Sequence, residues 1–364
     1  MKGPFKGIKN VLRLFQPKHH SILGIDITST TVKILEISSD GERLCVENYG
    51  REALPPHMLD GNIIKDIDAV ASCIKKLMDR LHTRCKQVAL AVPDAGVISK
   101  VVQISDGLND VEMEELVAIE VDKYIPYSID EINLDFEILG YSEKNPSMLD
   151  VLIVASRAEN VNNRVEAVIR AGMDVLVVDV ESYAVERVAL QLAKDLPELG
   201  QNKTIAIIDI GATYTHLFVL HGMKLIYSRD EKFGGTQLIE AIAEHYKLTF
   251  AQALATQEQV ALLIDYESAV LEPFKENILL QIKRTLHFFY SVSQEENIDH
   301  ILLAGGLAQL PGLVDVIQEQ LEIVTSVANP FVHMTHGKMV HWDSLNKDAP
   351  SFIVACGLAL RSIE

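Results

Sequence analysis

Two segments of the chain combine an aspartate with a short run of small residues that could bind a phosphate. Residues 24–33 read GIDITSTTVK, and residues 208–217 read IDIGATYTHL. In each segment an apolar stretch leads to the aspartate and a tight turn, and a second apolar stretch follows, which predicts a hairpin. When Asp26 is aligned with Asp209, the turn residues also match: Thr28 with Gly211, Ser29 with Ala212 and Thr30 with Thr213.

Both turns carry groups that recognise phosphate. A phosphate accepts hydrogen bonds and donates none, so backbone N–H groups, hydroxyls and cations bind it. The two turns supply such groups from Thr28, Ser29, Thr30 and Thr31 in the first and from Gly211, Ala212 and Thr213 in the second. Lys33 lies in the second strand of the first hairpin, where its ammonium group could reach a terminal phosphate.

The presence of two aspartates beside phosphate-binding turns is explained if a cation lies between them and the phosphate. Carboxylates repel a polyphosphate, and Mg²⁺ held by Asp26 and Asp209, usually through water, removes that repulsion. A single hairpin of this kind could be an ordinary polar turn. Two hairpins with matched aspartates, one in each half of the chain, favour two lobes that close on one nucleotide.

A pair of glycines late in the chain forms a third motif. Gly305 and Gly306 follow the apolar stretch 301–304 and precede Leu307. Because these glycines lack side chains, the backbone can approach a flat ligand such as a purine or its ribose. The alternative is a simple turn from a strand into a helix. The chain contains neither a P-loop nor a GxGxxG dinucleotide fingerprint.

The hydrophobic pattern predicts strands and helices around these motifs. Alternating or continuous apolar stretches indicate strands at 22–27, 32–37, 44–49, 88–92, 97–104, 134–141, 149–155, 175–180, 204–210, 215–220, 224–229 and 301–304. Helical spacing indicates helices at 67–81, 111–124, 161–171, 182–192, 235–246, 249–256, 271–291, 312–320 and 351–362. Residues 94–160 have a β-α-β-β order of their own, and residues 197–203 are the best candidate hinge.

Composition narrows the class of protein. A chain of 364 residues exceeds what one hydrophobic core usually holds, so two or more domains are expected. The net charge of −18 disfavours nucleic-acid binding, which requires clustered lysines and arginines. No apolar stretch is long enough for a transmembrane helix, and no signal peptide is indicated. The four cysteines form no C-x-x-C pair, which is typical of a reduced cytoplasmic protein.

The histidines do not indicate a metal site. His216, His221 and His245 lack carboxylate or cysteine partners at the spacing of metal ligands.

The first 20 residues differ from the rest of the chain. Residues 5–15 read FKGIKNVLRLF and carry cations but no acids. This basic leader could form a short amphipathic helix on an anionic membrane surface. The alternative is a solvated leader before Pro17.

The three motifs, in this order, resemble those of the actin-like ATPase superfamily, which includes actin, chaperone ATPases, sugar kinases and the cell-division protein FtsA. The resemblance spans residues 22–364. It implies an α/β actin-like fold of two lobes with ribonuclease-H-like mixed sheets, in which residues 25–33 and 208–215 bind phosphate and residues 303–306 bind adenosine. Residues 179–184 and 355–359 would connect the lobes. Thr28 departs from the superfamily, which usually has glycine there.

Three stretches resemble the PilM family of type IV pilus assembly more closely: residues 21–36, residues 120–136 with YIPY, and residues 282–290 with KRTLHFFY. The segment 94–160 matches the inserted subdomain that this family shares with FtsA. The resemblance implies a leader at 1–20, a first core subdomain (1A) at 21–93 and 161–200, the insert (1C) at 94–160, a second core subdomain (2A) at 201–230 and 298–364, and a helical subdomain (2B) at 231–297.

The resemblance also implies cofactors and partners. The protein would be a cytoplasmic adaptor that binds ATP and Mg²⁺ and is recruited to the cytoplasmic face of the inner membrane. Its partner would be the N-terminal cytoplasmic peptide of PilN, with PilO and PilP beyond it and the pilus motor ATPases as further candidates. The peptide groove would lie among residues 88–93, 97–102 and 112–124, where apolar surface flanked by acids suits a peptide with apolar anchors and an arginine.

Three further site residues follow from the resemblance. Glu181 is similar to a glutamate of chaperone ATPases and would be the catalytic base or water-orienting group. The alternative is that it only stabilises the N-terminus of the helix 182–192. Gln281 and Arg284, one helical turn apart, would contact ribose and adenine unless they belong to a solvated helix face. ATP hydrolysis is expected to be weak or absent.

Two other functions stay open. An FtsA-like filament-forming, membrane-linked protein normally carries a C-terminal amphipathic helix after a linker, whereas this chain stops at Glu364. An actin-like metabolite kinase needs an aspartate that deprotonates a substrate hydroxyl, and we find none in a clear context.

Overall fold

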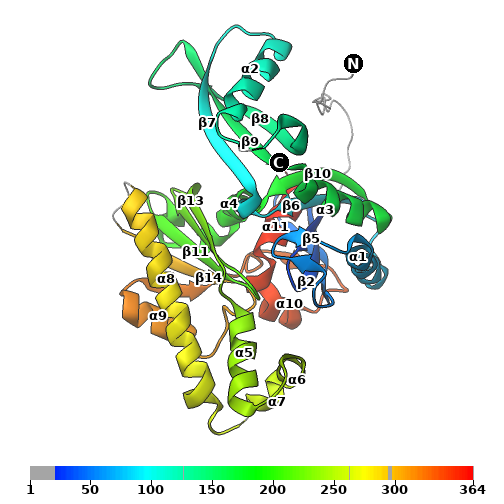
Figure 1. The fold of residues 1–364 in the computed structure, drawn as a ribbon, viewed down its shortest axis with the longest axis vertical. Helices are drawn as coiled ribbons and strands as arrows, with labels where there is room; N and C mark the ends of the chain where they lie inside the picture. Colours follow the sequence, from blue (N-terminus) through cyan, green and yellow to red (C-terminus); the bar gives the residue numbers. More distant parts are fainter. Residues whose placement is uncertain (1–20, 126, 262, 294–296, 364) are drawn as a thin grey trace.

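The computed structural model describes residues 21–125, 127–261, 263–293 and 297–363. Two large mixed sheets lie next to each other, and a smaller sheet stands at one end of the molecule (Figure 1). The basic leader lies outside the described residues. Within the described part of the chain, no helix is both long enough and apolar enough to cross a membrane.

The first large sheet carries the first phosphate turn. Its order is β10-β6-β1-β2-β3-β16, with β1 at Leu23–Ile27, β2 at Thr31–Ser39, β3 at Leu44–Ala53, β6 at Gln87–Val92, β10 at Asp174–Val180 and β16 at Thr335–His336. Strand β1 pairs antiparallel with β2 and parallel with β6, and this register puts Asp26 opposite Lys33. Helices α1 (Ile67–Leu81) and α3 (Ala158–Arg170) bury apolar side chains against one face.

The second large sheet repeats this pairing around the second phosphate turn. Its order is β13-β12-β11-β14-β15, with β11 at Thr204–Ile210, β12 at Thr215–His221, β13 at Lys224–Glu231, β14 at His300–Ala304 and β15 at Val324–Val327. Strand β11 is antiparallel to β12 and parallel to β14. Helices α5 (Gly235–Tyr246), α8 (Glu272–Val292) and α9 (Leu313–Leu321) cover one face. Short helices α6 (Phe250–Ala255) and α7 (Gln257–Val260) follow α5.

The insert forms a separate small layer. Strands β7 (Val97–Ser105), β9 (Met148–Arg157) and β8 (Ile132–Tyr141) make a three-stranded antiparallel sheet in that spatial order. Helix α2 (Asp110–Asp122) packs on one face of this sheet through Met113, Val117 and Val121. The predicted β-α-β-β order of residues 94–160 is confirmed.

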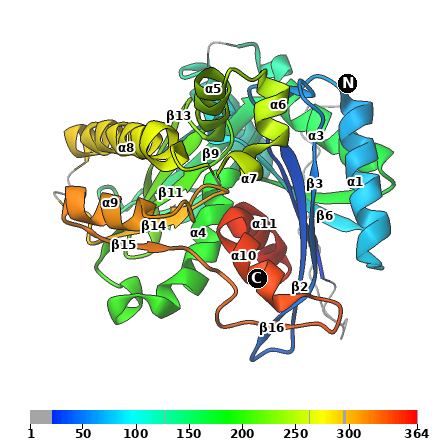
Figure 2. The same cartoon turned by 90° about the horizontal axis from the view of Figure 1, so that it is seen from below.

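Two helices lie between the large sheets, and they contact each other backbone to backbone. Helix α4 (Glu181–Leu192) follows β10, and helix α11 (Ile353–Ala359) packs against α4 and against β1 (Figure 2). A Cβ atom on Gly357 would lie 1.8 Å from the carbonyl oxygen of Ala184, and one on Gly24 would lie 2.2 Å from the carbonyl oxygen of Ala355. Only glycine allows this approach at both positions.

Several elements differ from the sequence-based expectation. The predicted helix 351–362 is not continuous. It consists of the short helix α11 (Ile353–Ala359) between two 3₁₀ turns, at Ala349–Phe352 and Leu360–Ser362. The sequence patterns did not predict several elements, because each is too short to show a periodicity. These are the hairpin of β4 (Leu59–Asp60) and β5 (Ile63–Ile64), strands β15 and β16, and helix α10 (Trp342–Asp348). Strand β16, which the predicted division assigns to the second core subdomain, pairs with β3 of the first sheet.

The glycine at the crossing of α4 and α11 gives a test of the packing. We expect Gly357→Ala to lower the free energy of unfolding by about 3 kcal/mol, because the added methyl group meets backbone that cannot move aside. Urea denaturation measures this change. The control is Gly306→Ala, whose methyl group would enter open space. Equal stability of the two variants would contradict the backbone contact.

Candidate functional site

The two predicted phosphate turns meet across the space between the large sheets. The Ser29 and Thr213 hydroxyls share a hydrogen bond of 2.9 Å, although 184 residues separate them in the chain. Each turn is closed in the same way: the N–H of Thr28 donates to the carbonyl of Thr31, and the N–H of Gly211 donates to the carbonyl of Tyr214, both at 2.9 Å. The structure therefore brings the two hairpins together at their turns, in matching geometry.

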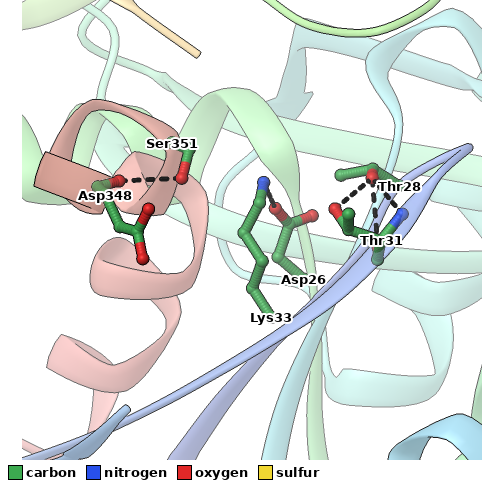
Figure 3. A network of polar contacts seen from close by, with 6 residues as sticks. All are labelled: Asp26, Thr28, Thr31, Lys33, Asp348 and Ser351. Atoms are coloured by element: carbon green, nitrogen blue, oxygen red, sulfur yellow. Dashed lines mark hydrogen bonds and ion pairs between the residues drawn. The ribbon is translucent and has the colours of Figure 1, made fainter. Parts of the chain in front are cut away.

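Thr28 closes the first turn with its own side chain. Its hydroxyl accepts a hydrogen bond from the N–H of Thr31 at 3.1 Å and lies 3.0 Å from both the carbonyl oxygen and the hydroxyl of Thr31 (Figure 3). The threonine that replaces the usual glycine thus keeps the turn tight. Thr30 is exposed and its carbonyl accepts from the N–H of Leu54 at 2.8 Å, so Ser29 and Thr30 present the outward hydroxyls of this turn.

Asp26 and Lys33 form an ion pair at the base of the first turn. The Lys33 ammonium lies 2.8 Å from a carboxylate oxygen of Asp26, and the two side chains are 13 % and 5 % exposed (Figure 3). Burial lowers the pKa of Lys33, but Asp26 and Asp209 outweigh burial and raise it above its ordinary value. The ammonium group is therefore charged. The carboxylate that we predicted to be a metal ligand holds it next to the first turn, in the space between the two large sheets where the turns meet, which we call the cleft.

Gly305 supports the other aspartate. A Cβ atom at this position would lie 2.4 Å from a carboxylate oxygen of Asp209 and 2.4 Å from the carbonyl oxygen of Ile210, and φ is +86°. The N–H of Leu307 donates to the carbonyl of Ile210 at 3.2 Å. The predicted adenosine motif at Gly305, Gly306 and Leu307 therefore lies directly against the second phosphate turn.

A glycine pair that the sequence analysis missed packs on the same turn. Gly234 precedes helix α5 and Gly235 is the first residue of the helix. A Cβ atom on Gly234 would lie 2.5 Å from the carbonyl oxygen of Gly211. The N–H of Gly235 donates to this carbonyl at 3.0 Å, and the N–H of Thr236 donates to the carbonyl of Ala212 at 2.7 Å. Paired glycines at the start of an apolar helix are a signal that could have indicated this contact.

Glu181 is the first residue of α4, and its side chain faces the cleft. Burial raises the pKa of this carboxyl to about 8, with a further increase from Asp26 and Asp94 and an opposing effect of His216. A glutamate with such a pKa is largely protonated at neutral pH. Glu181 starts a helix and also faces the charged cluster, so both roles weighed from the sequence stay predictions.

His216 adds a second cation on the opposite side of the cleft. Its Nδ1 lies 2.6 Å from a carboxylate oxygen of Asp230 on the neighbouring strand. Burial lowers the pKa of His216, but Asp230 and Glu181 outweigh burial and raise it to about 10. The sequence analysis gave His216 no carboxylate partner because Asp230 is brought to it only by the β12–β13 pairing. His245 likewise has a partner, Asp265, at 2.9 Å.

Arg164 is a buried guanidinium behind the cleft that sequence patterns did not indicate. It is 1 % exposed, and it donates to the carbonyls of Asn62 at 2.9 Å and Asn160 at 3.3 Å. Burial lowers the pKa of Arg164, and the carboxylates of Glu181 and Asp26 oppose that shift. The arginine therefore holds the β4–β5 hairpin on α3 and adds positive potential to the cleft.

The two predicted adenosine contacts lie on α8, away from the turns. Arg284 is exposed and stacks over the ring of Phe288, with 5.9 Å between the guanidinium carbon and the ring centre. Gln281 is half-buried, and its backbone carbonyl accepts from the Thr285 hydroxyl at 2.8 Å. Among the described residues, neither side chain has a hydrogen bond or ion pair to the cleft.

Of the three segments of the predicted peptide groove, one is buried and the other two line a crevice. Residues 88–92 form β6 in the interior of the first sheet and are buried, so they offer no surface. Between α2 and the small sheet lies a narrow apolar crevice lined by Ile98, Val102, Val121, Tyr124, Ile125, Ile153 and Ala155 together with Lys100. The Lys100 ammonium lies 3.5 Å from the ring centre of Tyr124, which places a cation and an aromatic ring at the mouth of the crevice.

Comparisons with known proteins agree with this geometry. The family model of the type IV pilus assembly protein PilM matches residues 24–363. A solved PilM–PilN type IV pilus biogenesis complex is 27 % identical with a TM-score of 0.78, and the match covers 95 % of this chain and 100 % of that chain. The ethanolamine utilization protein EutJ from Carboxydothermus hydrogenoformans is 16 % identical with a TM-score of 0.57, covering 95 % of this chain and 90 % of that chain.

A third similar structure is the ADP-bound form of MreB5 of Spiroplasma citri, at 13 % identity and a TM-score of 0.49, with 93 % of this chain and 94 % of that chain covered. The predicted α/β fold of two lobes is confirmed by the likeness to the PilM–PilN and EutJ structures and by the paired mixed sheets. This chain belongs to the PilM family of type IV pilus assembly proteins and has the actin-like ATPase fold.

Proposed function

We propose that this chain is a cytoplasmic adaptor of the type IV pilus inner-membrane complex that binds Mg-ATP in the cleft and a PilN-type peptide on the insert. The observation that carries the nucleotide part is the hydrogen bond between Ser29 and Thr213, which brings two phosphate-type turns from separate sheets to one place. Each turn stands beside an aspartate, and the space between them contains the charged groups Lys33 and His216.

The donor set fits a polyphosphate with its cation. Asp209 forms no ion pair with another described residue, and burial raises its pKa, so a cation would stabilise its ionised form. We propose that Asp26 and Asp209 hold Mg²⁺ through water, while Ser29, Thr30 and Thr213 donate to phosphate. The ion neutralises phosphate charge when it is bound.

We propose that the remaining predicted residues contact the same nucleotide. Backbone groups of Gly211 and Ala212 would complete the phosphate site, with the ammonium of Lys33 beside it. Gly305, Gly306 and Leu307 would contact the adenosine. Gln281 and Arg284, on α8, would contact ribose and adenine.

The insert is the proposed site for the PilN peptide. The similar solved structure is a PilM–PilN complex, and the crevice between α2 and the small sheet is apolar. Residues 94–160 contain 15 Asp and Glu but only 4 Lys and Arg, so a peptide with apolar anchors and an arginine would be complementary in charge. PilO and PilP would join through PilN, and the pilus motor ATPases are further proposed partners.

The alternatives receive less support. A metabolite kinase needs a base that deprotonates a substrate hydroxyl. In the cleft, the half-buried Glu181 is the candidate for such a base. An FtsA-like filament former would share the fold and the insert, but the match to the PilM family covers nearly the whole chain. Recruitment to the inner membrane through PilN needs no membrane segment in this chain.

We propose that ATP hydrolysis is slow at neutral pH. A general base must be deprotonated to accept a proton from water, and the pKa of Glu181 is raised to about 8. Most molecules then carry a protonated Glu181 at pH 7. This state suits an adaptor that holds a nucleotide rather than one that turns it over.

Removing one aspartate tests the nucleotide site. We expect Asp209→Ala to weaken Mg-ATP binding about tenfold or more, because a charge-assisted interaction with the hydrated cation is lost. Isothermal titration calorimetry measures the Kd. The control is Asp315→Ala, which removes an exposed acid from the first turn of α9 in the same lobe. Unchanged affinity in Asp209→Ala would rule out the proposed magnesium site.

The pH dependence of hydrolysis tests the role of Glu181. A base with a pKa of about 8 becomes deprotonated as the pH rises, so we expect the rate of phosphate release at saturating Mg-ATP to increase about tenfold from pH 7 to pH 9. In Glu181→Gln the rate should be low and independent of pH over this range. The same increase in both proteins would show that another group is the base.

A groove variant tests the partner site. We expect a PilN-type N-terminal peptide to bind with a Kd on the order of 1 μM to 100 μM, and Ile98→Asp to weaken binding about tenfold because it places a charge in the apolar crevice. Fluorescence anisotropy of the labelled peptide measures this. The control is Ile169→Asp on α3, where the side chain is already 57 % exposed. Failure of the wild-type chain to bind the peptide, with and without ATP, would refute the adaptor role.

A further inference from the structure

Asp94 lies where the insert leaves the first sheet. It follows Pro93 at the end of β6 and begins the short turn Asp94–Gly96 that leads into β7. Strands β6 and β10 are parallel neighbours with Val92 opposite Val180, and α4 starts directly after Val180. The topology therefore places the first residue of the insert next to the first turn of α4, although these segments are far apart in sequence.

Asp94 supplies the cap that α4 lacks. The residue before the helix, Val180, has no side chain that could accept a hydrogen bond, and none is made there. Instead, the carboxylate of Asp94 accepts from the N–H of Ser182 at 3.0 Å. A carboxylate at this position satisfies an unpaired N–H of the first turn and interacts favourably with the helix dipole. The N-terminus of α4 thus depends on a residue of the insert.

The helix end that Asp94 holds is part of the cleft. Glu181 is the first residue of α4 and faces the cluster of Asp26 and His216. A second contact ties the same turn to the insert, because the hydroxyls of Tyr183 and Ser99 share a hydrogen bond of 2.5 Å. Any displacement of the insert relative to α4 must therefore break one of these contacts or move Glu181.

The root of the insert packs against α3 and contacts β9. A Cβ atom on Gly96 would lie 2.4 Å from the side-chain nitrogen of Asn160 on α3. The hydroxyl of Ser156 on β9 donates to the carbonyl of Gly96 at 3.1 Å. Because Asp94 begins this same turn, movement of the small sheet is transmitted to Asp94.

The second lobe approaches the junction from the other side. Asp94 interacts electrostatically with Asp230 and His216, which form the ion pair between β13 and β12. Further along α4, the carboxylate of Glu186 accepts from the N–H of Leu225 on β13 at 2.9 Å. The insert, α4 and the second sheet therefore meet within one helical length.

We propose that Asp94 is a positioning residue for the nucleotide site, which holds the first turn of α4 and so couples the orientation of the insert to the position of Glu181 in the cleft. This inference rests on the proposed function, since it assumes a nucleotide in the cleft and a peptide on the insert. Coupling of this kind is reciprocal: nucleotide changes the affinity for the peptide by the same factor by which the peptide changes the affinity for nucleotide.

The experiment measures this factor with the full chain. The Kd of a PilN-type peptide is determined with and without Mg-AMPPNP, and the Kd of Mg-AMPPNP with and without the peptide, by calorimetry. We expect the wild-type chain to show a coupling factor of about 5 or more in both directions. In Asp94→Ala the factor falls to about 1 in both directions.

Two variants separate the cap from a general effect of the acid. Asp94→Asn keeps an oxygen that accepts from Ser182, so it should restore most of the coupling. Asp135→Ala removes an exposed acid of β8 in the same insert and should leave the factor unchanged. Hydrogen exchange at the first-turn amides of α4 gives a direct readout: nucleotide and peptide both change the protection in the wild type, and neither does so in Asp94→Ala.

The outcomes distinguish this inference from the proposed function. A wild-type chain that binds neither ligand refutes the proposed function itself. A chain that binds both ligands with a factor of 1, or an Asp94→Ala variant with the wild-type factor, overturns the role of Asp94 and leaves the adaptor function standing. If Asp94→Ala does not fold, Tyr183→Phe removes only the hydroxyl of the second contact; the factor should then fall, and an unchanged factor contradicts the coupling.

Discussion

The close approach of α11 to β1 and to α4 is the constraint on which the rest of the structure depends. At Gly24 and Gly357 the backbones come so near that any side chain would overlap a carbonyl oxygen. Strand β1 ends at the first phosphate turn and carries Asp26, and α4 starts at Glu181. The segment before α11 also contacts the other lobe, because the carbonyl of Pro350 accepts from the N–H of Gly305 at 2.8 Å. One helix therefore sets the distance between the parts of the cleft that come from different sheets.

The charges in the cleft follow from this arrangement. Burying a charge without a partner is costly, and the pairs Lys33–Asp26 and His216–Asp230 meet that requirement on the two sides of the cleft. Among the described residues Asp209 and Glu181 have no ion-pair partner, and burial raises the pKa of each. The site thus has two acids that are unfavourable when ionised, and a cation held by Asp209 would stabilise the ionised form of that acid.

Local patterns predicted the elements and the two turns, because each hairpin is defined by residues that are neighbours in sequence. Asp26, Thr28 and Lys33 all lie within one hairpin, and their contacts are those of a tight antiparallel pair. The same is true of the insert, whose strand and helix periods were clear. The subdomain boundaries and the roles of individual ligands remain predictions.

Contacts between distant segments were beyond sequence patterns. Asp230 reaches His216 only because β13 pairs with β12, and Arg164 meets Asn62 only because α3 packs over the β4–β5 hairpin. Neither pair has a characteristic spacing, so a single sequence contains no signal for it. Sheet register and helix packing decide these contacts, and both depend on the whole fold.

The departure at Thr28 and the raised pKa of Glu181 both support the proposed slow hydrolysis of ATP. The hydroxyl of Thr28 forms hydrogen bonds within the turn, to Thr31. The turn is therefore tight, and its backbone lacks the conformational freedom that a glycine would give it. Glu181 starts a helix whose cap belongs to the insert. These contacts are the reason that we propose a cleft that holds a nucleotide in a state coupled to the insert rather than one that turns it over rapidly.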